Sequence, residues 1–168
     1  IHNYKKGNIM NIKIICLGKL KEKYLQDGVN EYLKRIGKYA NINIIELPDE
    51  TIPENPSSKE IEHIKVLEAE KIKKHIKSQD YVISLDLTGK QLTSEEFSDK
   101  LREISVKGFG TIDFIIGGTV GIQKEIVTNS NFVFCLSKLT FPHQLVRLFL
   151  SEQIFRAYKI ANNEKYHW

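Results

Sequence analysis

Residues 112–121 read IDFIIGGTVG, a short apolar run followed at once by a glycine-rich turn. Two other segments, YVISLDL at 81–87 and FVFCL at 132–136, are apolar in the same continuous way. A strand with one face in solvent alternates apolar and polar residues, whereas continuous apolar runs indicate strands covered on both faces. These three segments therefore predict strands of a parallel sheet that is flanked by helices on both faces.

The rest of the chain alternates strands and helices before, between and after these three segments. Further strands are expected at 12–17 and 42–47, and helices at 22–40, 57–77, from 93 onward, at about 122–128 and at about 142–161. Ser57 with Glu60, and Thr93 with Glu96, have the spacing of capping boxes, which open helices. The pattern predicts an α/β fold, in which residues 10–168 form a single domain with a mostly parallel five-stranded sheet.

Two stretches lack any helical or strand period. Residues 1–9 precede the one methionine, Met10, and we expect them to be an upstream extension without ordered structure. The stretch 49–58 holds Pro53 and Pro56 and almost nothing apolar, which predicts a mobile loop.

The composition is that of an ordinary globular protein. Of the 168 residues, 41% are hydrophobic and 27% charged, so the chain as a whole is not predicted to be disordered. No apolar run approaches the roughly 20 residues of a membrane span, and no signal core is visible, so we expect a cytoplasmic protein without membrane contact. Cys16 and Cys135 lie in apolar segments that are predicted to be strands, and we expect both to be reduced thiols. No group of Cys and His residues in the sequence has the spacing of metal ligands. The net charge of +4 does not by itself indicate a nucleic-acid partner.

Three loops follow the carboxyl ends of these three continuous apolar strands. They read LDLTGK at 85–90, IGGTVG at 116–121 and LSKLTFPH at 136–143. In open α/β sheets ligands bind at this carboxyl edge, so the loops are the candidate site. Gly117 and Gly118 could also serve the backbone alone, by allowing positive φ. A dinucleotide fingerprint and a P-loop are both missing from the sequence, which disfavours those nucleotide-binding classes.

The predicted last helix is apolar on nearly all sides. His143, Arg147 and Ser151 are spaced at i, i+4 and i+8, and so form one narrow strip. A small sheet can cover only one side of such a helix, so a partner subunit is expected to cover another. A buried arginine needs an anionic or carbonyl partner. Arg147 is therefore either a functional residue or half of a structural ion pair, for example with Glu152.

The sequence resembles the RlmH family of SPOUT-class methyltransferases, which modify N3 of pseudouridine 1915 in 23S ribosomal RNA. The resemblance runs from Met10 to the end of the chain. It rests on LTFPHQLVR at 139–147, with the diagnostic Pro-His-Xaa-Xaa-Xaa-Arg pattern, on the two glycine turns at 85–90 and 116–121, and on the terminal Tyr166-His167. It implies a C-terminal trefoil knot, S-adenosylmethionine as cofactor without a metal, a homodimer, and large-subunit ribosomal RNA as the substrate.

The resemblance also assigns roles to individual residues. Cofactor contacts are implied for Leu85, Gly117, Leu136, Ser137, Lys138, Leu139, Thr140 and Phe141. Arg147 is the candidate for stabilising charge on the nucleobase, and His143 or His167 for the base or for positioning a water. Tyr166 and His167 are expected to contact RNA or the active site. His143 could instead only begin the helix, and the tail could be frayed. Family tails usually end on a basic residue, whereas this chain ends in Trp168.

Basic residues near the first strand and helix are candidates for RNA contact, although a merely solvated basic face is the alternative: Lys19, Lys21, Lys23, Lys34, Arg35 and Lys38. Two rival functions stay open on the sequence alone. One is a noncatalytic RNA- or ribosome-binding module of the same fold. The other is an adenine-cofactor enzyme with a different chemistry.

Overall fold

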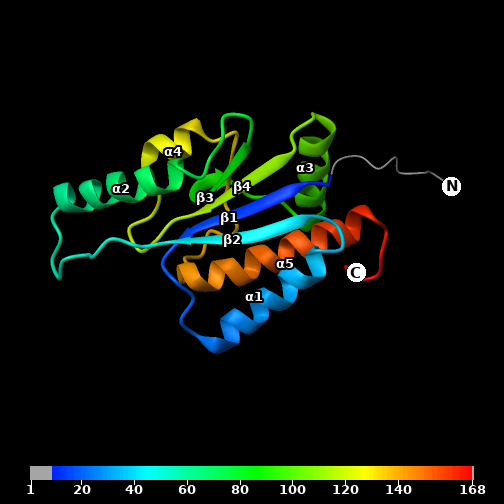
Figure 1. The fold of residues 1–168 in the computed structure, drawn as a ribbon, viewed down its shortest axis with the longest axis horizontal. Coiled ribbons are helices and arrows are strands. Elements are labelled where there is room, and N and C mark those ends of the chain that lie inside the picture. Colours follow the sequence, from blue (N-terminus) through cyan, green and yellow to red (C-terminus); the bar gives the residue numbers. More distant parts are fainter. Residues whose placement is uncertain (1–8, 168) are drawn as a thin grey trace.

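Five parallel strands form one sheet in the order β2-β1-β4-β3-β5 (Figure 1). The computed structural model describes residues 9–167. The strands are β1 (Asn11–Leu17), β2 (Asn41–Leu47), β3 (Tyr81–Lys90), β4 (Thr111–Ile116) and β5 (Phe132–Phe134). Strand β4 and the first four residues of β3 are buried almost throughout, which confirms that these two continuous apolar runs are doubly covered strands, whereas β5 lies at the edge of the sheet and is only partly buried.

Four helices connect the strands and a fifth follows the last strand, as the apolar periodicity predicted. They are α1 (Lys23–Ile36), α2 (Ser58–Lys73), α3 (Ser94–Val106), α4 (Lys124–Asn129) and α5 (His143–Ala161). Both predicted capping boxes are present: Ser57 and Glu60 bond reciprocally at the start of α2, and Thr93 and Glu96 do so at α3. Helices α2 and α3 therefore begin where these hydrogen bonds cap their first turns.

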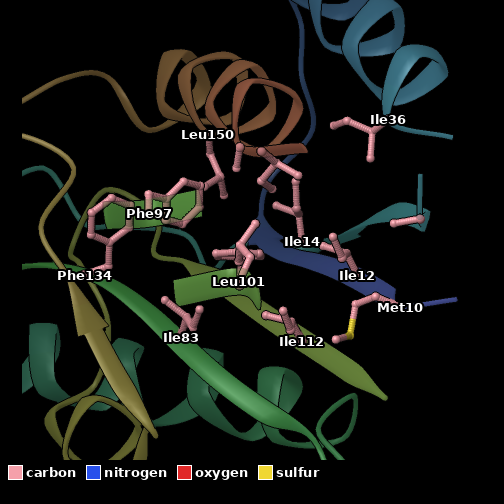
Figure 2. Close-up of a cluster of buried hydrophobic side chains, with 14 of the residues drawn as sticks. Met10, Ile12, Ile14, Ile36, Ile83, Phe97, Leu101, Ile112, Phe134 and Leu150 are labelled. Carbon is pink, nitrogen blue, oxygen red and sulfur yellow. The ribbon is translucent and has the colours of Figure 1, made fainter. Parts of the chain in front are cut away.

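The helices cover both faces of the sheet. Helices α1, α3 and α5 enclose the larger core, where Phe97, Leu101 and Leu150 pack against Ile12 and Ile14 of β1 (Figure 2). Helices α2 and α4 cover the other face. Helix α5 thus lies between the sheet, α1 and α3 (Figure 1). Two helices of the same chain therefore cover sides of α5 that we had expected a partner subunit to cover, and the homodimer stays a prediction.

Helices α1 and α5 approach each other closely at a glycine. A Cβ atom at Gly28 would lie 2.9 Å from a methyl carbon of Leu148, so the Leu148 side chain would have to move to make room for it. This packing holds the start of α5 beside the start of α1, at the carboxyl edge of the sheet (Figure 1).

Some predictions concern residues that the structure does not describe. These residues are the proposed upstream extension, apart from residue 9, and Trp168. The trefoil knot is compatible with the observed strand order and stays a prediction. Within residues 9–167, no helix combines the length and apolar character that a membrane span requires.

Candidate functional site

A cavity of about 630 Å³ lies at the carboxyl edge of the sheet. The loops after β3, β4 and β5 and the first turn of α5 line it, because parallel strands deliver their following loops to one edge. Its walls include eight of the residues singled out in the sequence: Leu85, Gly117, Leu136, Ser137, Leu139, Thr140, Phe141 and His143. Lys138 belongs to the same segment but is exposed and does not line the cavity.

Most of the other lining residues belong to the three loops that the sequence predicted as the candidate site, and Ile122, Cys135 and Val146 lie outside those loops. Asp86 and Leu87 extend the wall beyond Leu85, and Val146 adds an apolar side chain from α5. The remainder are Ile116, Gly118, Thr119, Val120, Gly121, Ile122, Cys135 and Pro142. Most of them adjoin predicted residues in the same loops. Val146 could have been found from its place one turn after Pro142 on the last helix.

The glycine turn after β4 folds back on itself. Gly121 has φ +83°, and its N–H donates to the carbonyl of Gly118 across 3.1 Å. A Cβ atom on Gly117 would lie 2.8 Å from the carbonyl carbon of Gly121, so the chain can make this turn only without a side chain there. Backbone groups therefore form this wall of the cavity.

The segment between β5 and α5 is irregular but tied locally. The N–H of Leu139 donates to Ser137 Oγ at 3.0 Å, and the thiol of Cys135 lies 3.2 Å from the carbonyl oxygen of Ser137. The edge of Phe141 packs against the ring of Phe149 on α5, with centroids 5.1 Å apart. These contacts hold the segment in a fixed conformation as a wall of the cavity. Because the segment is neither helix nor strand, few of its peptide groups are hydrogen-bonded in regular secondary structure.

His143 is the first residue of α5 and lies half-buried in the cavity wall. Burial lowers the pKa of this imidazole, and the positive charge of Arg147 lowers it further, whereas Asp49 acts in the opposite sense. The ring is therefore mainly neutral near pH 7 and able to accept a proton. Its position as the first residue of α5 fits the alternative role as well, and a catalytic role for His143 stays a prediction.

Arg147 has no exposed surface. Its guanidinium donates to Glu46 Oε2 at 2.7 Å and to the carbonyls of Leu17 and Gly18 at 2.8 and 2.9 Å. Its partner is thus Glu46 on β2, and the suggested pairing with Glu152 was wrong. The suggestion that Arg147 meets the nucleobase is also corrected, because every face of its side chain is covered within the chain.

The C-terminal tail is docked against α5 and α3 rather than frayed. Tyr166 donates to Glu152 Oε1 at 3.0 Å and packs edge-on against the ring of Phe155. His167 Nε2 lies 2.7 Å from Glu95 Oε1, and its Nδ1 lies 3.0 Å from Arg156 Nη1.

These contacts place the tail along the later turns of α5, away from His143 of the same chain. The structure therefore does not bring the four predicted catalytic residues together in one subunit.

A second cavity of about 590 Å³ lies between the start of α3 and α5. Glu152, the acceptor of the Tyr166 hydroxyl, lines this cavity. It shares Leu136, Ser137 and Phe141 with the first cavity, so the irregular segment separates the two. Among the described residues, no group of three or more His, Cys, Asp or Glu side chains is placed to hold a metal ion.

Comparisons with known proteins agree with this geometry. The family model described as "Predicted SPOUT methyltransferase" matches residues 10–167. The chain is 52% identical to the ribosomal RNA large subunit methyltransferase H of Clostridium acetobutylicum over 158 residues, which are 94% of this chain and 99% of the relative. It is also 52% identical, with the same coverage, to the protein of that name from Alkaliphilus oremlandii.

Solved structures show the same fold at low sequence identity. A probable methyltransferase from Bordetella pertussis matches with a TM-score of 0.53 and 10% identity, over 88% of this chain and 96% of that chain. A probable methylase family protein from Haemophilus influenzae matches with a TM-score of 0.50 and 15% identity, over 95% of this chain and 71% of that one. Both similarities concern the arrangement of strands and helices.

Proposed function

Because the chain belongs to the SPOUT methyltransferase family, we propose that it transfers a methyl group from S-adenosylmethionine to N3 of pseudouridine 1915 in 23S ribosomal RNA. The relatives named ribosomal RNA large subunit methyltransferase H support large-subunit ribosomal RNA as the substrate. One structural observation carries the proposal: three strand-end loops and the half-buried His143 meet in one cavity.

The cavity fits S-adenosylmethionine in size and lining. A volume of about 630 Å³ lies in the range of sites for ligands of this size. Leu85, Ile116, Leu136 and Phe141 supply apolar surface for an adenine ring. Backbone groups of Gly117 and of the segment 136–141 would hold the polar edges of the cofactor. When bound, the cofactor supplies an electrophilic methyl group on a sulfonium sulfur.

His143 is proposed as the proton acceptor. The N3 position of pseudouridine carries a proton between two carbonyl groups, so it is a weak nucleophile until that proton leaves. A neutral imidazole in the cavity wall can accept the proton directly or through a water. Arg147 is proposed as a positioning residue, because its contacts fix the start of α5 against the end of β1.

A homodimer is proposed as the working form. The side chains of Leu87, Leu139 and Phe149 are exposed large apolar groups close to the cavity, at 59%, 69% and 36% exposure. A second copy would cover this surface. Tyr166 and His167 do not reach the cavity of their own subunit, so any part they have in catalysis is proposed to be played in the partner's site.

The cytoplasm is the proposed location, since the substrate is part of the ribosome. The deciding experiment incubates the protein with labelled S-adenosylmethionine and ribosomes that lack the modification, with 70S ribosomes, free large subunits and naked 23S RNA as separate substrates. Mass spectrometry of the digested RNA should find methyl on N3 of the target pseudouridine. Methyl at another nucleotide would refute the substrate assignment. A noncatalytic RNA-binding module would neither bind the cofactor nor transfer methyl.

A further inference from the structure

The segment between β1 and α1 carries an exposed aromatic ring among lysines. Tyr24 is 67% exposed, more than any other aromatic side chain of residues 9–167. Lys19, Lys21 and Lys23 are exposed beside it in the sequence. Lys23 pairs with Asp27 at 2.8 Å, whereas ion pairs to Lys19 and Lys21 are absent from the described part of the chain. An exposed aromatic ring and two exposed lysines without ion pairs therefore lie within residues 19–24.

The backbone of this segment is held firmly, although it is neither helix nor strand. The N–H of Leu20 donates to Glu46 Oε2 at 2.8 Å, and Gln26 Nε2 donates to the carbonyl of Leu20 at 2.6 Å. Gly18, with φ +81°, is bonded to β2 through its N–H and to Arg147 through its carbonyl. The segment thus presents its side chains from a fixed scaffold, which lowers the entropy cost of binding with them.

The same contacts place the segment beside the candidate active site. Glu46 accepts from both Leu20 and Arg147, and therefore joins the segment to α5. The N–H of Lys21 lies 3.5 Å from Gln144 Oε1, and the neighbouring His143 lines the cavity. The starts of α1 and α5 lie at the same end of the sheet (Figure 1). The segment therefore lies next to the end of α5 that lines the cavity.

An aromatic face next to phosphate-binding cations is the combination that holds single-stranded nucleic acid. We propose that Tyr24 stacks on an unpaired base of the ribosomal RNA substrate, while Lys19 and Lys21 bind phosphates beside that base. This inference rests on the proposed function and adds a binding site outside the cavity. An apolar protein partner would fit less well, because the ring is bordered by charged residues.

Variants at position 24 separate the effect of the ring from that of apolar area. Binding to unmodified 70S ribosomes is measured with S-adenosylhomocysteine present, together with methyl transfer. Tyr24→Ala should raise Kd and KM roughly tenfold or more, the scale of one lost stacked base, with kcat within about twofold. Tyr24→Phe should bind nearly as the wild type does. Tyr24→Leu should behave as Tyr24→Ala, because leucine has no aromatic face.

Charge variants test the phosphate contacts. Lys19→Gln and Lys21→Gln should each reduce the slope of log Kd against log salt by about one unit or slightly less. Lys124→Gln, on the far face of the sheet, and Val106→Ser, at the end of α3, are matched controls that should leave binding unchanged. Calorimetry with S-adenosylhomocysteine should give equal cofactor affinity for all of these variants.

Several outcomes would overturn the inference. Wild-type Kd in Tyr24→Ala would show that no base stacks there. Normal binding by Tyr24→Leu, or conversion of Tyr24→Ala to monomers in sedimentation, would mean that the ring packs against a second copy of the chain. A wild-type protein that methylates no ribosomal RNA would refute the proposed function instead, and the binding series would still decide the role of Tyr24.

Discussion

The guanidinium of Arg147 on α5 binds the carboxylate of Glu46 on β2 across 2.7 Å. The arginine is fully buried, whereas the Glu46 side chain keeps 35% of its surface exposed. Two backbone carbonyls accept from its Nη2, whereas its buried Nε has no hydrogen-bond partner among the described residues. Because Glu46 also accepts from Leu20, this pair connects the helix that carries His143 to the segment that carries Tyr24.

Loss of Arg147 should reduce stability more than loss of its partner. Arg147→Ala removes three hydrogen bonds and leaves carbonyls buried, so unfolding free energy should fall by about 3 kcal/mol in urea titrations. Glu46→Gln should cost about 1 kcal/mol, since a neutral bond can remain. Arg147→Lys should recover little, because an ammonium group cannot reproduce the planar fork. Unchanged stability of Arg147→Ala would contradict the buried network.

The glycine turn after β4 should control cofactor binding. Gly117→Ala places a Cβ against backbone atoms of Gly121 and Ile122, so the turn must shift. S-adenosylhomocysteine affinity, measured by calorimetry, should fall roughly tenfold or more, the scale of a displaced hydrogen-bonding wall. Gly110→Ala is the matched control, since a Cβ there meets nothing within 4 Å. Equal affinities in the two variants would remove the turn from the binding site. Chelators should have no effect on either.

The depressed pKa of His143 should appear in the pH dependence of turnover. A base must be neutral to accept the N3 proton, so lowering its pKa keeps it active at lower pH. We expect kcat at saturating ribosomes to hold as pH falls to the ordinary histidine value of about 6.5 and to decline only below it. His143→Gln should lose this decline and about a hundredfold in kcat. An unchanged profile in His143→Gln would assign the proton transfer to another group.

A charged substitution should have different effects at the two phenylalanines of α5, Phe149 and Phe155. Phe149 is 36% exposed, so Phe149→Asp should yield folded monomers with a normal circular dichroism spectrum. Phe155 is only 5% exposed and belongs to the core, so Phe155→Asp should unfold the chain. Val106→Asp, at an 81% exposed position, is the control and should remain dimeric in sedimentation. A dimer that survives Phe149→Asp would locate the interface elsewhere.

The tail can be tested by mixing two inactive proteins. One carries His143→Gln, which should lose about a hundredfold in kcat, with an intact tail, and the other lacks residues 166–168 but keeps its cavity. If the tail serves the partner's site, subunit exchange should restore about a quarter of wild-type activity, because half of the dimers then hold one complete site. If the tail serves only its own subunit, mixing should restore nothing. Thermal melting of the truncated protein controls for the lost contact of Tyr166 with Phe155.

The sequence by itself determined the strands, the helices and the edge at which the cavity lies. Continuous apolar runs identified β3 and β4, and the pairs Ser57–Glu60 and Thr93–Glu96 gave the helix starts. These signals are local, since a strand's burial and a helix's first hydrogen bonds depend on residues a few positions apart. Parallel strands then bring their following loops together, which is why most of the predicted cofactor residues line one cavity.

Only the tertiary structure decided which distant side chains meet. The partner of Arg147 is 101 positions away, whereas the sequence offered Glu152, five residues on and turned to another side of the helix. The tertiary structure likewise places Tyr166 and His167 away from His143. It also packs α1 and α3 on sides of α5 that we had expected a partner subunit to cover. Periodicity tells which faces of an element are buried, but the order of strands and the packing of helices determine what each face is buried against.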